Sequence, residues 1–511
     1  MNPNDNQIST ISQFYNGKSV FITGGTGFLG KVLVEKLLRS CPGIENIFLL
    51  VRPKKGKSID ERLADLTASQ CFDLLREKNQ KALNKIVLIE GNTSDLGLGI
   101  SKENRELLCN KVSVIIHSAA TVRFVEAFKY SVNTNLRAVN ELLKLSKEVK
   151  NLKSFVHIST AYSNWFQPVI EEKHYPAEFD PQYIIDLFNS TPDDQLEKLA
   201  PKLYGKHVNI YTFTKSLAED LAVKTPKDFP FAIVRPSVVG ASFAEPHPGW
   251  VDSYTATTPL VDQSARGVIR ALNCHKNYVF DVIPVDIVIN QVIAVSWKIA
   301  NDSASKSGIS SPLVYNCVSG TTNPITIKEI CQYSRDAGKK SPSELMRWYP
   351  QTRFYKTRTL FKIDTFLTHY IPALLSDAVD KLRGIDGKAV NYYNKVQYGA
   401  SQLKFIMNTS IMWKTENGPK LLSSMDKHDQ KVFNFDPKIY NWRSYIDDFY
   451  YGIRKFMTND KTACSIAAQK KFARLKYANY IVSGSIAAIS LFALVKAGDQ
   501  IINKDAERSK I

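Results

Sequence analysis

The feature that most restricts the fold of this chain is a glycine-rich loop between a predicted strand and a predicted helix. Residues 20–22 form a short apolar run typical of a strand, and residues 31–39 carry apolar side chains at helical spacing. The loop between them reads Thr23, Gly24, Gly25, Thr26, Gly27, Phe28, Leu29, Gly30. Glycines let a backbone approach a pyrophosphate at a helix N-terminus. A merely flexible loop is the alternative, but the strand before it and the helix after it favour dinucleotide binding.

Apolar runs alternate with helical patterns throughout the first half of the chain. The runs lie at residues 47–51, 86–89, 112–116, 155–158 and 231–234. Continuous apolar strands that alternate with helices are typical of a parallel sheet covered on both faces. The sequence therefore predicts an α/β fold with a doubly wound parallel (Rossmann-type) sheet, in a large domain over residues 15–335.

Composition limits the partners and the compartment. The 511 residues suffice for about two to four domains. The net charge of +18 suits an anionic partner, which is a membrane surface, a phosphorylated small molecule or a nucleic acid. The seven cysteines show no C-x-x-C spacing and the eight histidines no H-x-x-x-H spacing, so neither a disulfide framework nor a metal site is expected. The N-terminus lacks the apolar stretch of a secretory signal, which predicts folding in a reducing compartment.

The end of the second predicted strand indicates which dinucleotide binds. An NAD site usually has an acidic residue there, bonded to the ribose 2′-hydroxyl. This chain has Arg52, Pro53, Lys54 and Lys55 instead. A cationic cluster matches a 2′-phosphate and favours NADPH, although basic residues in a solvated loop are the alternative.

A tyrosine and a lysine are candidates for the reacting groups. Tyr211 and Lys215 have the Y-x-x-x-K spacing, which places both side chains on one helix face. A nearby ammonium is expected to lower the tyrosine pKa and make the phenol a usable acid. Tyr451 and Lys455 share the spacing, but they lie far beyond the alternating region and are expected to be structural.

Two hydroxyl side chains follow the fifth predicted strand. Ser159 and Thr160 come directly after the run at residues 155–158. Ligands bind at the carboxyl ends of strands in such sheets, so a hydroxyl there could hold a substrate oxygen. A simple turn is the alternative.

The second half of the chain carries basic and aromatic residues together. Residues 335–362 contain eight Lys or Arg and two acids, with five aromatic residues among them. This composition is compatible with single-stranded nucleic acid, with a lipid interface or with a solvated linker. The apolar residues 366–375 are too few to cross a bilayer and suggest core or interfacial insertion.

A charge-free run lies near the C-terminus. Residues 477–495 contain no charged side chain and would span roughly 28 Å as a helix. The sequence therefore predicts a C-terminal transmembrane helix over residues 477–496, with a buried or interfacial helix as the alternative. The even distribution of basic residues on both sides gives no firm orientation.

Together these stretches resemble the eukaryotic, alcohol-forming fatty acyl-CoA reductases of the extended short-chain dehydrogenase/reductase superfamily. The resemblance runs nearly end to end. It is carried by residues 23–30, 117–120, 156–164, 235–240, 248–252, 283–286 and 315–320. It implies a NADPH-binding reductase domain, a smaller and mostly helical C-terminal domain over residues 355–455, and a membrane anchor.

The resemblance also implies residue roles. Tyr211 would donate a proton to the substrate carbonyl and Lys215 would hold the nicotinamide ribose. Thr160, with Ser159 beside it, takes the superfamily's hydroxyl position, and Asn135 would support the lysine through water. The implied cofactor-binding residues are Gly24, Gly25, Thr26, Gly27, Phe28, Leu29, Gly30, Arg52, Lys54, Asn92, Ala119, Tyr211 and Lys215. At Asn92 relatives usually have Asp, and we expect changed affinity rather than lost binding.

The implied reaction is the reduction of long-chain fatty acyl-CoA to a fatty alcohol by two hydride transfers through a bound aldehyde. Membrane lipid is the second expected partner, and nucleic acid is not needed. The catalytic body is expected in the cytosol, and the C-terminal Ser-Lys-Ile leaves both peroxisomal and endoplasmic reticulum membranes open. The alternatives are a steroid or sugar-nucleotide dehydrogenase or epimerase of the same fold, and a non-catalytic membrane scaffold with a relic nucleotide fold.

Overall fold

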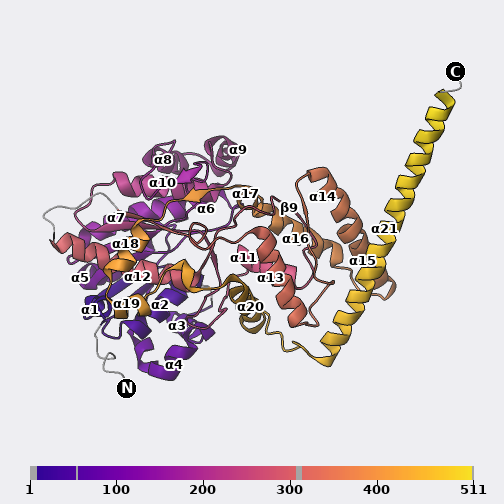
Figure 1. Cartoon of the computed structure of the whole chain (residues 1–511). Coiled ribbons are helices and arrows are strands. Elements are labelled where there is room, and N and C mark those ends of the chain that lie inside the picture. The colour runs from indigo at the N-terminus through magenta and orange to yellow at the C-terminus, as the bar shows by residue number, and fades with distance from the viewer. Residues whose placement is uncertain (1–8, 53–55, 306–312, 509–511) are drawn as a thin grey trace. The chain divides into compact units, whose positions relative to one another are not determined.

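The computed structural model of the chain describes residues 9–52, 56–305 and 313–508 (Figure 1). The chain divides into two compact units. The first comprises Met1–Pro259, Cys274–Ile330 and Tyr398–Met457, and the second comprises Leu260–Asn273, Cys331–Gln397 and Thr458–Ile511. The first unit therefore takes residues from both halves of the sequence.

A seven-stranded sheet forms the centre of the first unit, in the order β3-β2-β1-β4-β5-β7-β11. All neighbouring strands are parallel. The strands are β1 (Ser19–Thr23), β2 (Ile47–Val51), β3 (Ile86–Glu90), β4 (Val112–His117), β5 (Ser154–Ile158), β7 (Phe231–Pro236) and β11 (Leu313–Cys317). The strand order reverses between β1 and β4, and ligands bind at the carboxyl ends of such a pair. The predicted doubly wound parallel sheet is confirmed.

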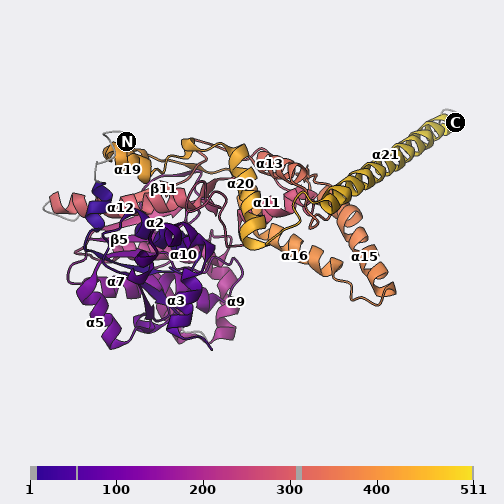
Figure 2. The ribbon, with the colours of Figure 1, turned by 90° about the horizontal axis from the view of Figure 1, so that it is seen from below.

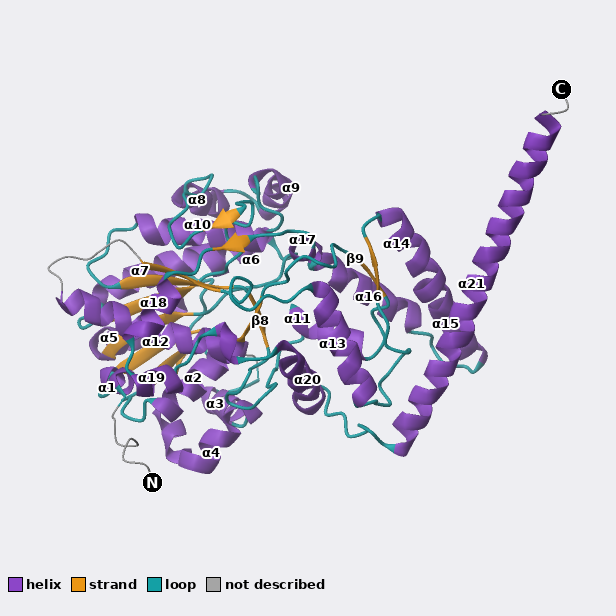
Figure 3. Cartoon of the chain, viewed as in Figure 1, coloured by secondary structure: helices purple, strands orange, loops and turns teal. Residues whose placement is uncertain are grey.

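Helices cover both faces of this sheet (Figure 3). On one face, α12 (Val285–Ser305) contacts β5, β7 and α2 (Phe28–Ser40). On the other, α7 (Ala138–Glu148) and α10 (Ile210–Lys224) contact each other and share a continuous apolar core with Phe21, Ile115 and Phe155 of the strands. Figure 2 shows α12 on one side of the strands and α5 (Lys102–Lys111) and α7 on the opposite side. All five residues of β1 are buried. Since side chains alternate between the two faces of a strand, both faces of β1 are covered.

The remaining helices of the first unit are mostly short. They are α1 (Thr10–Tyr15), α3 (Ile59–Thr67), α4 (Asp73–Asn79), α6 (Phe128–Val132), α8 (Pro181–Ser190), α9 (Asp193–Leu203), α17 (Lys404–Met407), α18 (Asn417–Ser424), α19 (Lys427–Val432) and α20 (Trp442–Gly452). Helices α11 (Thr257–Ala265), α13 (Ile327–Lys340) and α16 (Ala389–Gln402) contain residues of both units.

Two short parallel strand pairs lie outside the main sheet of the first unit. Strand β8 (Val238–Gly240) pairs with β10 (Val282–Pro284). Strand β6 (Val169–Ile170) pairs with β13 (Met412–Trp413). The second pair joins the loop after β5 to a segment more than 240 residues later in the chain.

The second unit is mainly helical. It contains one strand pair, β9 (Ala271–Asn273) with β12 (Arg353–Tyr355). Its helices include α14 (Arg358–Thr365), a π-helical turn η5 (Phe366–Tyr370), α15 (Ile371–Leu382) and the 43-residue α21 (Ile466–Arg508). The structure has the predicted helical C-terminal region, but residues 398–455 of the predicted domain at 355–455 belong to the first unit.

The predicted membrane segment lies within α21. Over the described part of the chain, no helix combines the length and the apolar character needed to cross a membrane. Many side chains of residues 477–496 fall outside the described residues. The transmembrane character of this segment stays a prediction.

Candidate active site

The glycine-rich loop joins β1 to α2, as its spacing predicts. Gly24 has a φ of +76°, a conformation that favours glycine. A Cβ on Gly24 would lie 2.7 Å from the backbone N of Ala119, and a Cβ on Gly30 would lie 2.1 Å from the backbone O of Gly24. Gly27 is the N-cap of α2. The tight turn and the uncapped N–H groups at the start of α2 fit a dinucleotide pyrophosphate.

The other predicted loop residues lie beside this turn. Phe28 stacks on Trp250, with ring centroids 5.5 Å apart. The backbone N of Ala119, at the end of β4, donates to Thr23 Oγ1 at 3.3 Å. The carboxyl ends of β1 and β4 are thus held together at the point where the strand order reverses.

Arg52 follows β2 directly, and no acidic side chain occupies that position. The Arg52 side chain is exposed and donates from Nη1 to the Tyr130 hydroxyl at 3.0 Å. Lys54 lies outside the described residues. The placement of Arg52 is compatible with a 2′-phosphate, whereas a ribose 2′-hydroxyl would need an acceptor.

Asn92 follows Gly91 at the end of β3. Its Nδ2 donates to Asp95 Oδ1 at 3.1 Å, and its Oδ1 accepts from the backbone N of Ser94 at 3.3 Å. Asn92 therefore stabilises the turn after β3, which gives it a structural contact in addition to the predicted cofactor contact.

Tyr211 and Lys215 lie one turn apart on α10. The helix is capped by Asn209, whose side chain accepts from the backbone N of Thr212 at 2.9 Å. Lys215 Nζ donates to the backbone O of Ile158 at 2.8 Å and lies 3.5 Å from His157 Nε2. Burial lowers the pKa of Lys215 to about 8, against the opposing charge of Glu219.

Thr160 lies next to the Tyr211 phenol. Burial raises the pKa of Tyr211 to about 12, while a hydrogen bond with Thr160 acts in the opposite direction. The expected lowering of this pKa by Lys215 is therefore not observed, because desolvation of the phenol outweighs the other effects. The phenol is protonated at neutral pH and can donate.

Ser159 and Asn135 are the other two predicted catalytic residues. Ser159 Oγ is buried and makes no hydrogen bond in the described structure. Asn135 lies in a π-helical turn, η4 (Asn133–Arg137). Its side chain bonds the backbone N and O of Thr121 at 2.9 and 3.1 Å and donates to Thr214 Oγ1 at 3.0 Å. Asn135 thus joins the loop after β4 to the residue that precedes Lys215.

The second Y-x-x-x-K pair is placed differently. Tyr451 is exposed near the end of α20, while Tyr211 lies beside Thr160 at the end of β5. Of the two tyrosines, only Tyr211 therefore lies beside the hydroxyl of Thr160 at a strand end.

Two histidines behind Lys215 were not predicted as site residues. The rings of His117 and His157 stack with centroids 5.1 Å apart. Burial, assisted by the Lys215 charge, lowers the pKa of His117 to about 3 and that of His157 well below its ordinary value. Both rings are neutral, so they add no charge that would expel the Lys215 ammonium. The only feature of the sequence that could have identified them is their position at the carboxyl ends of two predicted strands, which are β4 and β5 of the structure.

A buried ion pair also supports the site. Arg235 Nη2 and Glu219 Oε2 lie 2.6 Å apart and both side chains are almost fully buried. Glu219 also accepts from Ser163 Oγ at 3.1 Å. The carboxylate of Glu219 favours the charged form of Lys215, four residues earlier on the same helix. No local pattern in the sequence pairs these residues, which come from α10 and β7.

A cluster of aromatic side chains lies beside Tyr211. The Phe124 ring centroid is 6.0 Å from that of Tyr211 and 5.5 Å from that of Phe405 on α17. The Tyr162 and Trp165 rings each lie 6.1 Å from Phe405. We call Phe124, Tyr162, Trp165 and Phe405 the aromatic cluster. It gives the phenol an apolar border, and Phe405 reaches it from the last quarter of the chain.

The segment that carries Phe405 is anchored to the loop after β5. Trp413 Nε1 donates to the backbone O of Ala161 at 3.0 Å, directly after Thr160. The β6–β13 pair adds backbone bonds nearby, from Met412 N to Pro168 O and from Lys414 N to Ile170 O. These contacts fix residues 404–413 against the loop that positions the hydroxyl.

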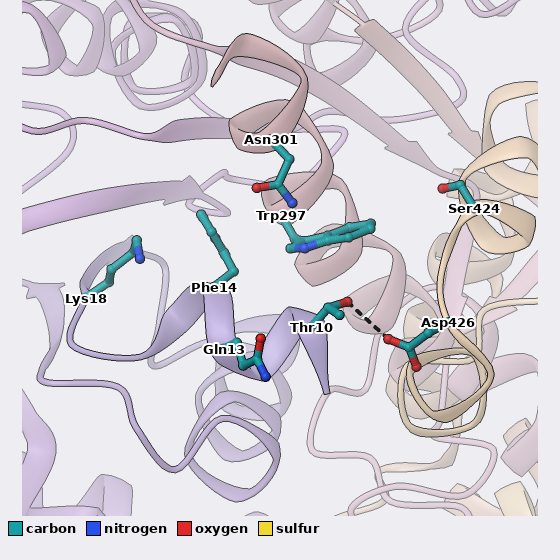
Figure 4. A pocket seen from close by; sticks show the side chains of 8 residues that line it. All are labelled: Thr10, Gln13, Phe14, Lys18, Trp297, Asn301, Ser424 and Asp426. Atoms are coloured by element: carbon teal, nitrogen blue, oxygen red, sulfur yellow. Dashed lines mark hydrogen bonds between the residues drawn. The ribbon is translucent and has the colours of Figure 1, made fainter. Parts of the chain in front are cut away.

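A separate pocket of about 630 Å³ lies elsewhere in the first unit (Figure 4). Its lining residues are Thr10, Gln13, Phe14, Lys18, Trp297, Asn301, Ser424 and Asp426. None of the predicted site residues lines it, and the hydrogen bond from Thr10 to Asp426 across it stabilises the fold.

Comparison with known proteins identifies the family. A family model described as "Male sterility protein" matches residues 22–292. Fatty acyl-CoA reductase 1 of Xenopus laevis is 35% identical over 92% of this chain and 90% of its own length. Fatty acyl-CoA reductase 2 of Homo sapiens is 34% identical over 96% of this chain and 94% of its own length. This chain belongs to the fatty acyl-CoA reductase family.

The fold of this reductase resembles that of other reductase domains. The terminal R domain from the myxalamid PKS-NRPS pathway aligns with a TM-score of 0.57 and 17% identity, covering 87% of this chain and 92% of that one. A second family model, also described as "Male sterility protein", matches residues 368–460 and includes Phe405 and Trp413. The chain is an oxidoreductase, and its family and fold imply a nicotinamide cofactor. In the described residues, no three His, Cys, Asp or Glu side chains are grouped to hold a metal ion.

Proposed function

We propose that this reductase converts a long-chain fatty acyl-CoA into a fatty alcohol and free CoA, with the consumption of two NADPH. The observation that carries the proposal is the contact between the Tyr211 phenol and Thr160, with Lys215 one turn away and the aromatic cluster alongside. A proton donor and a buried cation stabilise the negative charge that develops on the carbonyl oxygen during reduction, and an apolar border suits the fatty acyl chain.

The choice of NADPH rests on the end of β2. Arg52 is exposed there, and the main alternative, a carboxylate for a ribose hydroxyl, is missing. The glycine loop and the N-terminus of α2 would hold the pyrophosphate, and Lys215 would hold the nicotinamide ribose. When bound, the nicotinamide supplies a hydride to the substrate carbon.

The chain's own residues then handle the oxygen and its proton. The Tyr211 phenol donates a proton to the carbonyl oxygen as negative charge develops there, and Thr160 holds the phenol in position. Ser159 Oγ, which is unbonded and buried, offers a second donor to the same oxygen. The backbone O of Ile158 fixes the Lys215 ammonium, one helical turn from Tyr211.

The conversion of a thioester into an alcohol takes two rounds of reduction. The first hydride and proton give a hemithioacetal, which would return its hydroxyl proton to the Tyr211 phenolate as it collapses to an aldehyde and CoA thiolate. The second hydride and proton reduce the aldehyde to an alcohol. The aromatic cluster would keep the acyl chain in place between the rounds, because apolar side chains bind a hydrocarbon chain by excluding water.

We extend the proposal to a membrane location. The charge-free residues 477–496 of α21 would anchor the reductase in the peroxisomal or endoplasmic reticulum membrane, with the catalytic body in the cytosol. The proposal is supported by the basic residues on both sides of this segment and by the membrane-soluble character of the product.

Product analysis tests the proposed reaction. We expect the full chain with palmitoyl-CoA to yield hexadecanol and two NADP⁺ per alcohol, and to use NADPH better than NADH. Tyr211→Phe removes the proton donor and should lower kcat by about 10²–10⁴-fold, whereas Tyr451→Phe serves as the control and should have no effect. Turnover of a sterol or a sugar nucleotide in place of acyl-CoA would contradict the proposal.

A further inference from the structure

The second unit contains a long helical segment whose apolar side faces outward. Helix α14, the π-helical turn η5 and helix α15 run consecutively from Arg358 to Leu382. The residues that this segment buries are Thr365, His369 and Ala373, which are small or polar and recur every four residues. They place one narrow face of the helix against the rest of the unit.

Most large apolar residues of the same segment are exposed. Between 44% and 88% of each side chain is accessible in Leu360, Ile363, Phe366, Leu367, Leu374, Leu375, Val379 and Leu382. Residues 366–375 were expected either to form core or to insert at an interface. Their exposed apolar side chains are not in a core, so insertion at an interface is the alternative that is left. A soluble surface helix shows the opposite pattern, with apolar residues buried and polar residues outside. Contiguous apolar exposure of this kind marks a surface that contacts something else.

The first part of α21 repeats this reversed pattern. Ala468 and Asn479 are buried, and the Asn479 side chain accepts from Trp348 Nε1 at 3.0 Å and from Gln351 Nε2 at 2.7 Å. Its exposed large apolar and aromatic residues include Tyr477, Tyr480, Ile481 and Val482. A polar side chain therefore faces the unit and the apolar side chains face away from it.

Polar contacts also join the α14–α15 segment to the interior of the unit. His369 Nε2 accepts from the backbone N of Arg270 at 3.3 Å. The Arg270 guanidinium lies over the Trp348 ring, 5.1 Å from its centroid. Trp348 in turn bonds Asn479 of α21. These side-chain contacts between the helices and the unit are thus polar or aromatic, and the large aliphatic residues named above are left outside.

Cationic residues accompany the exposed apolar ones. Arg358 and Lys362 are exposed on α14, and Lys470 and Arg474 are exposed on α21 just before its apolar residues. Cations beside an exposed apolar face match the anionic headgroups and the acyl boundary of a bilayer. A protein partner would more often present a face with a polar rim and few cations at its centre.

We propose that the exposed apolar face of α14–α15 inserts into the interfacial layer of an anionic lipid bilayer. This contact is separate from a membrane crossing by residues 477–496, because α14–α15 would lie in the plane of the interface at a depth of about 5–10 Å. It would hold the second unit on the lipid surface whether or not α21 crosses the bilayer.

Lipid-quenching fluorescence on the full chain tests this surface. An environment-sensitive fluorophore is attached at Leu375→Cys in a Cys464→Ser background, and the protein is mixed with vesicles of phosphatidylcholine and phosphatidylserine. The matched control carries the label at Leu96→Cys, an exposed leucine of the first unit. We expect lipids brominated on their acyl chains to quench most of the fluorescence at position 375 and little at position 96. Equal or absent quenching at the two positions would overturn the proposal.

A substitution experiment separates lipid contact from self-association. Leu367→Glu with Leu375→Glu should reduce binding to anionic vesicles several-fold, whereas Leu96→Glu with Leu199→Glu adds the same charge to exposed leucines of the first unit and should not. Unquenched fluorescence together with disulfide cross-linking of two chains through Leu375→Cys would overturn the proposal in favour of a second copy. Alcohol formation measured on the same samples reports the reductase activity independently, so a failure of the catalytic proposal would be recognised separately.

Discussion

Lys215 depends for its charge on the groups around its ammonium. The backbone O of Ile158 accepts a hydrogen bond from the Lys215 ammonium at 2.8 Å, while burial lowers the pKa of Lys215 to about 8. A lysine with a lowered pKa is charged below that value and loses its proton as the pH rises through it. An uncharged Lys215 would bind the nicotinamide ribose more weakly, so its titration should be visible in cofactor use.

We expect kcat/KM for NADPH to be level below pH 8 and to fall about tenfold per pH unit above it, because this parameter reports groups of the free protein. Lys215→Arg keeps the charge to higher pH and should move the falling limb upward, with some loss of rate. Steady-state kinetics between pH 6 and 10 provide the measurement. A profile that stays level to pH 10 would contradict the role given to Lys215.

Within the aromatic cluster, we expect Phe405 to contribute most to binding of the proposed acyl chain. Phe405→Ala removes a partly exposed ring that contacts Phe124, Tyr162 and Trp165. We expect kcat/KM for a long-chain acyl-CoA to fall about tenfold, and that for a short-chain acyl-CoA to change little, because one lost apolar contact is worth that much discrimination. The control is Met412→Ala, which truncates an exposed apolar residue of the same segment. Equal losses at all chain lengths would assign Phe405 a purely structural role.

At the scale of elements, the glycine loop is packed so closely against its own backbone that Gly30 has no room for a side chain. Gly30→Ala would place a Cβ against the backbone O of Gly24, so the start of α2 has to shift. We expect the dissociation constant for NADPH to rise about tenfold or more with little change in helix content. Gly399→Ala, in α16 where a Cβ meets nothing within 4 Å, is the control. Fluorescence titration with NADPH and circular dichroism are the two measurements.

The elements that sequence reasoning located share a local cause. The predicted runs at residues 112–116 and 155–158 correspond to β4 (Val112–His117) and β5 (Ser154–Ile158), because a strand buried on both faces is a continuous apolar run. Tyr211 and Lys215 were found for a similar reason, since four residues on a helix bring two side chains to one face.

The contacts that sequence reasoning missed are between distant segments. Nothing near Phe405 indicates that α17 lies beside Tyr211, and nothing near Glu219 identifies Arg235 as its partner. The Tyr211 pKa was misjudged because the effect of burial depends on packing, which a spacing motif does not contain. Residues 366–375 were left open between core and interface because hydropathy alone does not show which side of a helix faces outward.

At the scale of the whole molecule, buried neutral histidines make stability depend on pH. Burial is the main cause that lowers the pKa values of His117 and His369 to about 3 and that of His207 to about 4. These groups bind protons in the unfolded chain near its ordinary pKa, about 6.5, but not in the folded chain. Above about pH 6.5 these groups are neutral in both states and do not lower the free energy of unfolding. As the pH falls from about 6.5 towards their pKa values in the folded chain, each group lowers the free energy of unfolding by about 1.4 kcal/mol per pH unit.

We therefore expect the thermal unfolding temperature to be lower at pH 5.5 than at pH 7.5. His117→Gln removes one such group, so its unfolding temperature should change less between the two pH values than that of the unsubstituted chain. Differential scanning calorimetry at both pH values makes the comparison. An equal shift in the two proteins would show that His117 is not a source of the pH dependence.

The bond from Trp413 to Ala161 joins positions 252 residues apart in the sequence. A chain emerging from the ribosome can therefore form its nucleotide-binding sheet long before the loop with Thr160 receives its last neighbours. A nascent chain that has not yet reached residue 404 already contains every predicted cofactor-binding residue but not Phe405. Premature termination before residue 404 would leave a protein that has the glycine loop, Tyr211 and Lys215 but lacks the aromatic border beside them.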